Sequence, residues 1–464
     1  MKRVIQSVAL TCWVLALPAA WAQDQAVAEQ ASASQQRAAS TPPSPFMAVG
    51  EVSRSDEKIQ AFLNERGWVQ GESPNNPAGG TLVVASQDIA VDPTSIDFSQ
   101  ARLIATEEAF LQAMGELVAQ DSVRVGKTMA DRFMQNGLPQ EVEDTTSLKA
   151  LGKALSSRLA EASVQTLNRV IEELGGDTGN LPQLNIAERE QLLFDEFVTQ
   201  TTWQAMGELS GIGIFGVIEE VGGDGPVNNG RVTVVVVKSD RFSEFGRQLR
   251  TGDVAPGQAI PVDQIQQRLK PQIEAGEPML GYFGVQPIAD AQGRYGLMAF
   301  GTGAPALVRG AMDEFEISAE LEAARSSAQL MADGWLAQFA TMTVQGQKKS
   351  SRRKLRERVQ ETRADGTARE FSASNVGRMV NNVLRSEAQA HLQGVQTVGQ
   401  WNATDPTTGH PYLGYVKYWS PATSAKAQGL GAAKASQEQP DSAGGKDAGG
   451  VAESSRATGA FGEW

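Results

Sequence analysis

The spacing of apolar positions divides the chain into two similar units. In the first unit, the apolar stretch Thr81–Val91 precedes a segment in which small apolar residues recur every four positions. In the second unit, Leu297–Leu307 precedes a segment with the same spacing. Four-residue steps keep side chains on one face of a helix, and alanine on that face lets the helix lie close to a sheet. The recurring residues are Ala101, Ala105, Ala109, Ala113 and Leu117 in the first unit, and Ala324, Ala328, Ala332 and Leu336 in the second.

Each unit continues with a short helical pattern, an apolar strand, a turn and a second strand. In the first unit these are Trp203–Leu209, Gly211–Val221, Gly222–Gly230 and Val232–Val237, and in the second they are Ser386–Leu392, Gly394–Trp401, Asn402–His410 and Tyr412–Trp419. Both turns are rich in Gly, Asn, Asp or Pro, as hairpin connections require. Because strand, helix, helical insertion and hairpin occur twice in one order, we expect an internal duplication; two unrelated α+β domains are the alternative. The duplication hypothesis requires the first strand and the hairpin of each unit to share a sheet.

The segments between these elements also carry patterns. Leu148–Leu174 is predicted to be helical and to end at Gly175 and Gly176, whereas residues 341–385 are polar and basic. Val262–Glu274 is predicted to be a connecting helix, and Tyr282–Ile288 a strand paired with Tyr295–Phe300.

The predicted fold class is α+β, with two related domains. Each domain is expected to be a small, mainly antiparallel sheet packed on a long Ala-rich helix, with helical insertions. The expected organisation is a signal peptide at 1–22, a disordered linker at 23–45, a first α+β domain with a helical insertion at 46–250, a connecting helix and hairpin strand at 251–296, a second α+β domain with a basic insertion at 297–424, and a disordered tail at 425–464.

The first residues have the pattern of a cleaved export signal. Lys2 and Arg3 precede the short apolar stretch Val8–Leu17, and Ala20-Trp21-Ala22 matches the A-x-A pattern of signal peptidase sites. We therefore expect cleavage between Ala22 and Gln23 and a periplasmic mature protein. Cys12 is the one cysteine of the chain and lies inside the signal, so the mature protein should form no disulfide.

Charge narrows the classes of partner. The formal net charge is −13, and removal of residues 1–22 makes it more negative. Such a chain is repelled by nucleic acid, so no nucleic-acid partner is expected. No apolar run after the signal reaches the roughly 18 residues of a membrane span, so no span is expected in the mature chain.

Several motifs resemble catalytic or binding sequences without the context that such sites need. Gly211–Gly216 spells G-x-G-x-x-G, but a helix precedes it and a strand follows, the reverse of a dinucleotide-binding turn. Its glycines are expected to permit a bulge or close backbone approach. Gly301–Ala306 is expected to be a strand that ends in a tight turn. His391 and His410 are isolated, and the adjacent acids Glu219 and Glu220 should point to opposite sides of a strand.

A dense basic run is the one charged feature that stands out from the acidic background. It consists of Lys348, Lys349, Arg352, Arg353, Lys354, Arg356 and Arg358. It is a candidate contact for a polyanion or an acidic partner surface, with a solvated segment that balances nearby acids as the alternative. It contains no aromatic residue that could stack on bases, which disfavours single-stranded nucleic acid. If the run binds an anionic envelope component, replacing Arg352, Arg353 and Lys354 by Gln should weaken binding with little effect on folding.

Ala299–Gly303 (A-F-G-T-G), the Ala-spaced helix after it and the later hairpin resemble the small β-α-β-β domain of bacterial envelope proteins. That domain occurs in certain outer-membrane lipoproteins and in the flagellar outer-ring protein that builds the T ring. Gly284–Phe300 is also similar to a segment of uncharacterised exported proteins from Gram-negative bacteria. The resemblance implies a protein that assembles or binds rather than catalyses.

The functional hypothesis is therefore a non-enzymatic periplasmic protein that acts in an envelope assembly through contacts with other envelope proteins. The alternative is an exported enzyme of hydrolase type whose carboxylates converge only in three dimensions. No catalytic, cofactor-binding or metal-binding residue is predicted, and no cofactor is expected.

Overall fold

The computed structural model describes residues 46–49, 55–134, 147–177, 179–207, 209, 211–221, 230–251, 259–290, 292–307, 312–345, 349–364, 377–378, 380 and 394–427. All of them belong to one unit that spans Ser44–Gly462. The expected signal peptide, the linker at 23–45, the turn at 222–229 and the helix at Ser386–Leu392 lie outside the described residues.

Sheet A is built by the first half of the chain. Its strand order is β1-β4-β5-β3-β2, and every neighbouring pair is antiparallel except β1 and β4, which are parallel. The strands are β1 (Phe46–Val49), β2 (Gly71–Glu72), β3 (Thr81–Asp88), β4 (Ile212–Glu220) and β5 (Arg231–Lys238).

Sheet B is built by the second half and is entirely antiparallel, with the order β6-β7-β9-β8. Its strands are β6 (Gly284–Ala289), β7 (Tyr295–Gly303), β8 (Gln396–Thr404) and β9 (Pro411–Trp419). In both sheets the first strand of the predicted unit and its hairpin lie together, as the duplication hypothesis requires.

The two sheets correspond in detail. β3, β5 and β4 are ordered as β7, β9 and β8 are, and the register shifts at Ile214/Gly216 in β4 and at Thr397/Gly399 in β8. A helix also precedes the equivalent strands β2 and β6 on the chain. α3 (Ser55–Arg66) places Phe62 against Gly216, and α10 (Val262–Ala275) places Ile273 against Gly399. The repeat therefore includes α3 and β2, whose correspondence to α10 and β6 was not predicted.

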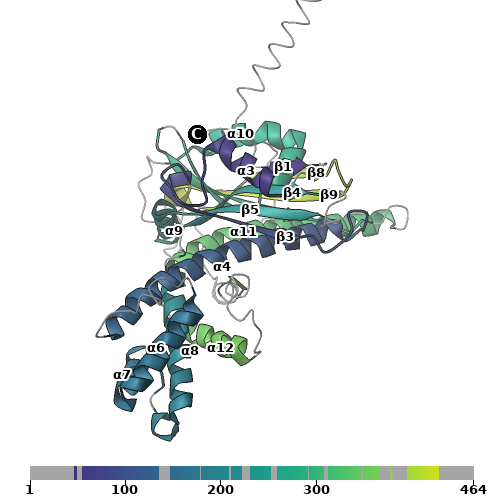
Figure 1. Ribbon diagram of the computed structural model, residues 1–464. Coiled ribbons are helices and arrows are strands. Elements are labelled where there is room, and N and C mark those ends of the chain that lie inside the picture. Colours follow the sequence, from purple (N-terminus) through teal and green to yellow (C-terminus); the bar gives the residue numbers. More distant parts are fainter. Residues whose placement is uncertain are drawn as a thin grey trace, which may run out of the picture. The chain divides into compact units, whose positions relative to one another are not determined.

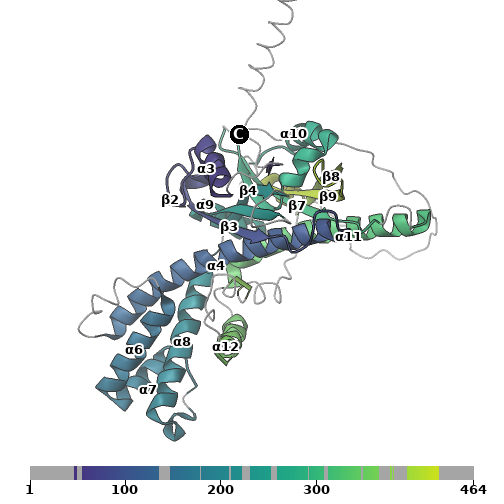
Figure 2. The ribbon, with the colours of Figure 1, turned by 45° about the vertical axis from the view of Figure 1, so that its right-hand side comes forward.

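The two long helices lie on one side of the sheets, with α3 and α10 on the other (Figures 1 and 2). They are α4 (Phe98–Phe133) and α11 (Glu314–Gln345). Of the alanines that the spacing singled out, they bury all but Ala101, which is half-buried. α11 lies so close to β7 that a Cβ on Gly301 would stand 1.9 Å from the Ala328 carbonyl oxygen. The prediction that small residues bring helix and sheet together is confirmed.

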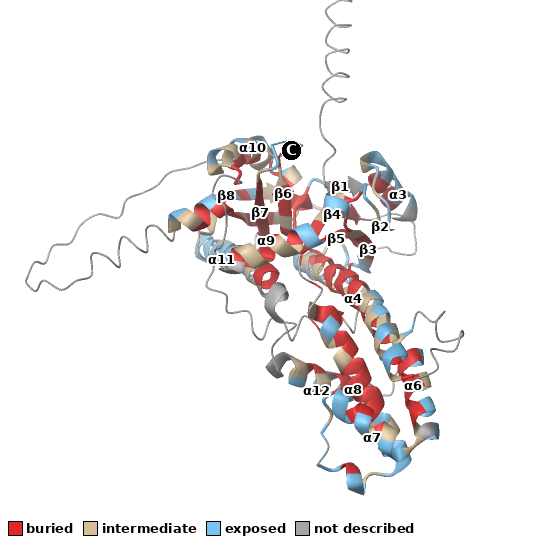
Figure 3. Ribbon diagram, turned by 90° about the vertical axis from the view of Figure 1, so that its left-hand side faces the viewer, coloured by how far each residue is buried: buried red, intermediate tan, exposed pale blue. Residues whose placement is uncertain are grey.

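The first insertion forms a helical lobe with its own hydrophobic core (Figure 3). Its helices are α6 (Leu148–Ala162), α7 (Val164–Glu173) and α8 (Ile186–Gly207). The single helix predicted over Leu148–Leu174 is wrong, because Ser163 is extended and its hydroxyl accepts a hydrogen bond from the Thr166 amide at the start of α7. Gly175 ends α7 with a positive φ of 81°, which confirms the predicted stop.

Other helices in the described ranges include α9 (Asp240–Thr251), α12 (Lys349–Ala364) and a short helix at 421–427. The 3-10 turns there include η1 (Pro77–Gly79), η2 (Leu181–Gln183) and η4 (Glu277–Gly281). The helix at 421–427 crosses the predicted boundary between residues 424 and 425, since Thr423 and Ser424 are buried against the fold. No helix in the described part of the chain is long and apolar enough to span a membrane.

One hydrophobic core joins the two sheets on the α4 and α11 side. Its buried members include Val234 and Val236 from sheet A, and Leu297, Ala299 and Trp419 from sheet B. A second core lies between sheet B and α10.

Candidate interaction surface

The basic run lies in α12, and its predicted residues have different environments. Arg352, Leu355, Arg356 and Val359 follow the spacing of one helix face, and Leu355 and Val359 are fully buried. Arg353 faces outward with 82 % of its side chain exposed. Lys349 and Arg358 also lie in α12, whereas Lys348, Ala22 and Gln23 lie outside the described residues.

Arg352 and Arg356 both contact the buried carboxylate of Glu196 on α8. Arg352 Nη2 donates to Glu196 Oε2 at 3.2 Å and also to the Leu174 carbonyl oxygen. Arg356 Nη2 donates to Glu196 Oε2 at 2.9 Å and to the Gly175 carbonyl oxygen at 2.8 Å. These carbonyls end α7, where a cation also interacts favourably with the helix dipole.

This geometry corrects part of the sequence interpretation. Arg352 and Arg356 fasten α12 to the helical lobe and do not form a solvated surface, so a variant that includes Arg352→Gln is expected to disturb the fold. The recurrence of Leu355 and Val359, each three residues after one of these arginines, was the signal for a buried face, because two apolar residues four positions apart lie on the same side of a helix.

A second arginine, Arg102 on α4, was not predicted and connects the two sheets. Its Nε donates to Glu219 Oε1 at 2.6 Å, its Nη2 donates to the Leu280 carbonyl oxygen at 3.0 Å, and its guanidinium lies 5.0 Å from the Tyr412 ring centroid. Burial is the largest single influence and lowers the pKa of Arg102, but the electrostatic interactions with Glu219, Tyr412 and Asp405 together outweigh it. The pKa of Arg102 is therefore raised further above its usual value. The signal in the sequence was an arginine on the alanine face of α4, three residues before Ala105.

The adjacent acids Glu219 and Glu220 are separated as predicted. Glu219 points to Arg102, whereas Glu220 lies 3.7 Å from Lys58 on α3, at the other face of sheet A. The carboxylates of Glu219 and Glu196 are both held by arginines, and no group of three His, Cys, Asp or Glu side chains suited to a metal ion occurs among the described residues.

The remaining motifs have structural roles in the part of the chain that the structure describes. The bulge predicted at Gly211–Gly216 lies between Ile214 and Gly216. His410 is half-buried: its ring stacks on Phe98, and its Nε2 donates to the Pro93 carbonyl oxygen at 3.0 Å. His391 lies outside the described residues.

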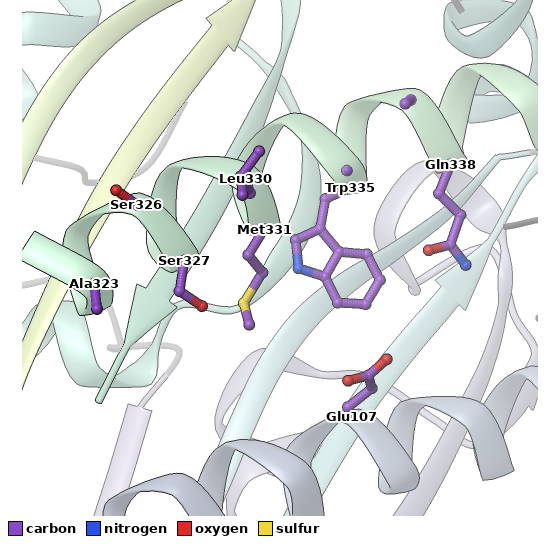
Figure 4. A pocket seen from close by; sticks show the side chains of 10 residues that line it. Glu107, Ala323, Ser326, Ser327, Leu330, Met331, Trp335 and Gln338 are labelled. Carbon is purple, nitrogen blue, oxygen red and sulfur yellow. The ribbon is translucent and has the colours of Figure 1, made fainter. Parts of the chain in front are cut away.

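An apolar groove of about 630 Å³ runs along α11, with Glu107 of α4 across from it (Figure 4). Small residues along α11 leave room for a close neighbour, and Gly334 has open space where a Cβ would stand. The groove is lined by Glu107, Ala323, Ser326, Ser327, Leu330, Met331, Gly334, Trp335, Ala337 and Gln338.

Two side chains give this groove its character. Leu330 lines the groove and is 72 % exposed. Trp335 is buried, and its ring forms T-shaped pairs with the rings of Phe110 and Phe283. Its Nε1 has no hydrogen-bond acceptor among the described residues. The groove therefore combines apolar side chains with the polar side chains of Glu107, Ser326, Ser327 and Gln338.

Comparison with known proteins gives little about function. Residues 152–251, from α6 to α9, match the Domain of unknown function (DUF6844). No curated protein matches. A solved structure, the hypothetical protein FTT1539c from Francisella tularensis, is similar at 15 % identity over 82 % of this chain and 96 % of that chain, with a TM-score of 0.48.

Proposed function

We propose that this chain is a non-enzymatic periplasmic protein that acts in a bacterial envelope assembly by binding other envelope proteins. The observation that carries the proposal is the groove along α11 with the exposed Leu330 at its wall. Water-exposed apolar surface of this kind costs free energy in an isolated chain, and a protein partner that covers it recovers that free energy.

Further residues on α11 support a protein contact. Phe315 is 81 % exposed and lies fifteen residues before Leu330, about 60° away around the helix at 100° per residue. Phe315 and Leu330 therefore lie on the same general side of α11, about 22 Å apart along its axis. The export pattern at Lys2–Ala22 supports the periplasmic address.

The test places a photo-cross-linkable phenylalanine derivative at Leu330 in the full chain. We expect light-dependent adducts with an envelope protein in the periplasmic or membrane fraction, identified by mass spectrometry. The matched control carries the same group at Val164, an apolar residue of α7 that is 38 % exposed and remote from the groove in sequence. Absence of adducts at Leu330, equal adducts at both positions, or recovery of the chain in the cytoplasm would contradict the proposal.

The alternative of an exported hydrolase receives no specific support from the described residues. The buried carboxylates of Glu196, Glu219 and Asp290 all face arginines. Such ion pairs are typical of structural links between elements.

A further inference from the structure

The outer edge of β8 differs from the other sheet edges. β1 has four residues and β2 has two, and β6 contains Pro287, which packs beside Gly213 of β4. β8 has nine residues and ends sheet B, and no other strand pairs with its outer edge within the described ranges. α10 covers one face of β8 near Gly399.

The repeat indicates what this edge can accept. Alignment of the two bulges at Gly216 and Gly399 makes Val217–Glu220 of β4 equivalent to residues 400–403 of β8. Val217–Glu220 is where β1 pairs with β4. In sheet A, β1 therefore pairs with the part of β4 that follows the bulge. In sheet B, no strand among the described residues pairs with the equivalent part of β8.

The chemistry of β8 does not protect the edge. Natural edge strands carry charges or proline that discourage pairing with another chain. Gln396–Thr404 has neither, although the chain as a whole has a net charge of −13. Gln400, Asn402 and Thr404 are exposed on one face.

We propose that two copies of this chain associate by antiparallel pairing of residues 400–404 of β8 about a two-fold axis. Asn402 then lies opposite Asn402 of the second copy, and Gln400 lies opposite Thr404. An uncharged strand favours a second copy, since the acidic surfaces of two chains repel each other wherever charged residues would meet. This inference uses a surface separate from the groove and does not depend on the proposed function.

One strand pair buries less than the roughly 1,200 Å² of a stable interface, so the association should be weak. Sedimentation equilibrium of the mature chain at roughly 1 to 200 µM should show a dimer whose share grows with concentration. Hydrogen exchange should show residues 400–404 protected at high concentration and unprotected at low concentration.

Asn402→Lys places two like charges opposite each other and should leave the chain monomeric with its melting temperature unchanged. Asn402→Glu should do the same, and an equimolar mixture of the two variants should dimerise again, because unlike charges then meet across the axis. The control is Thr407→Lys, which adds the same charge in the exposed β8–β9 turn and should dimerise as the unaltered chain does.

Three results would overturn the proposal. They are a monomer at every concentration, a dimer that Asn402→Lys leaves intact, or protection of residues 400–404 that does not change with concentration. A mixture of the Lys and Glu variants that stays monomeric would also exclude the two-fold arrangement.

Discussion

Glu219 and Glu196 are two buried carboxylates held by arginine, in two different settings. Glu219 pairs with Arg102, both nearly enclosed, where sheet A meets η4 and β9. Glu196 is fully buried, but Arg352 and Arg356 keep 21 % and 27 % of their side chains exposed. The first pair joins the two repeats, and the second fastens the helix of the second insertion to the lobe of the first.

The difference shows how burial decides the outcome of the same chemistry. Around Arg102, Glu219, Tyr412 and Asp405 together outweigh burial, and the pKa of the arginine rises. At Glu196, burial outweighs both arginines and raises the pKa of the carboxyl. Loss of Arg102 should therefore leave the Glu219 carboxylate charged and without access to water. Arg352 and Arg356, in contrast, can turn toward solvent if their contact with Glu196 is lost.

The largest effect is expected from Arg102→Ala. It leaves Glu219 buried without its cation and should lower the free energy of unfolding by about 3–5 kcal/mol. Urea unfolding at neutral pH measures this. Arg124→Ala, which removes an arginine that is 61 % exposed and paired with Asp121, is the control and should cost less than about 1 kcal/mol. Equal losses in the two variants would contradict the assignment of Arg102 as the link between the repeats.

Arg356→Gln should have an intermediate effect, about 1.5–3 kcal/mol, because it removes charge-assisted hydrogen bonds to Glu196 and the Gly175 carbonyl. We expect faster hydrogen exchange in α12 than in α6. Arg353→Gln on the same helix should change neither measurement. If the two variants behave alike, α12 is not held by the inward arginines.

The raised pKa of Glu196 predicts a pH dependence. A carboxyl whose pKa is higher in the folded chain than in the unfolded chain binds its proton more tightly when folded. Its contribution is therefore favourable below the unfolded pKa and is lost as pH rises through the raised value. Relative to Glu196→Gln, the unaltered chain should lose stability over the pH range that begins at about 4.3, the ordinary pKa of a glutamate, and extends upward. Urea unfolding across this range tests the sign, and a relative gain with rising pH would refute it.

The smallest effect on stability is expected from Arg353→Gln, within about 0.5 kcal/mol. If the outward face of α12 contacts an anionic envelope component, this variant should bind less tightly to lipopolysaccharide-coated beads, and binding by the unaltered chain should fall as salt rises. Unchanged binding at low and moderate salt would assign the basic run to internal contacts alone.

Local pattern was sufficient for many elements. The alanine spacing predicted the buried faces of α4 and α11, and β-branched runs predicted strands such as β5. The break at Ser163 was missed because the apolar spacing continues across it, while a capping hydrogen bond interrupts the helix. The strand β1 was missed because four residues carry too little periodicity to distinguish a strand from a linker.

The candidate sites were less predictable. The sequence located the basic run, but only the packing of α12 on α8 separates the inward Arg356 from the outward Arg353. The groove beside Trp335 was not foreseen, because the distance between α4 and α11 is a property of the packed core. Arg102 appeared as one charge in an alanine-rich helix until its partners were known.

By itself, the sequence determined the α+β class, the order of the repeated elements and the close approach of helix to sheet, because periodicity and residue size act over a few neighbouring positions. The tertiary structure alone decided which charged side chains form ion pairs inside the fold and which edge of each sheet is covered. Those outcomes depend on contacts between residues more than one hundred positions apart, such as Arg102 with Glu219 and Arg352 with Glu196.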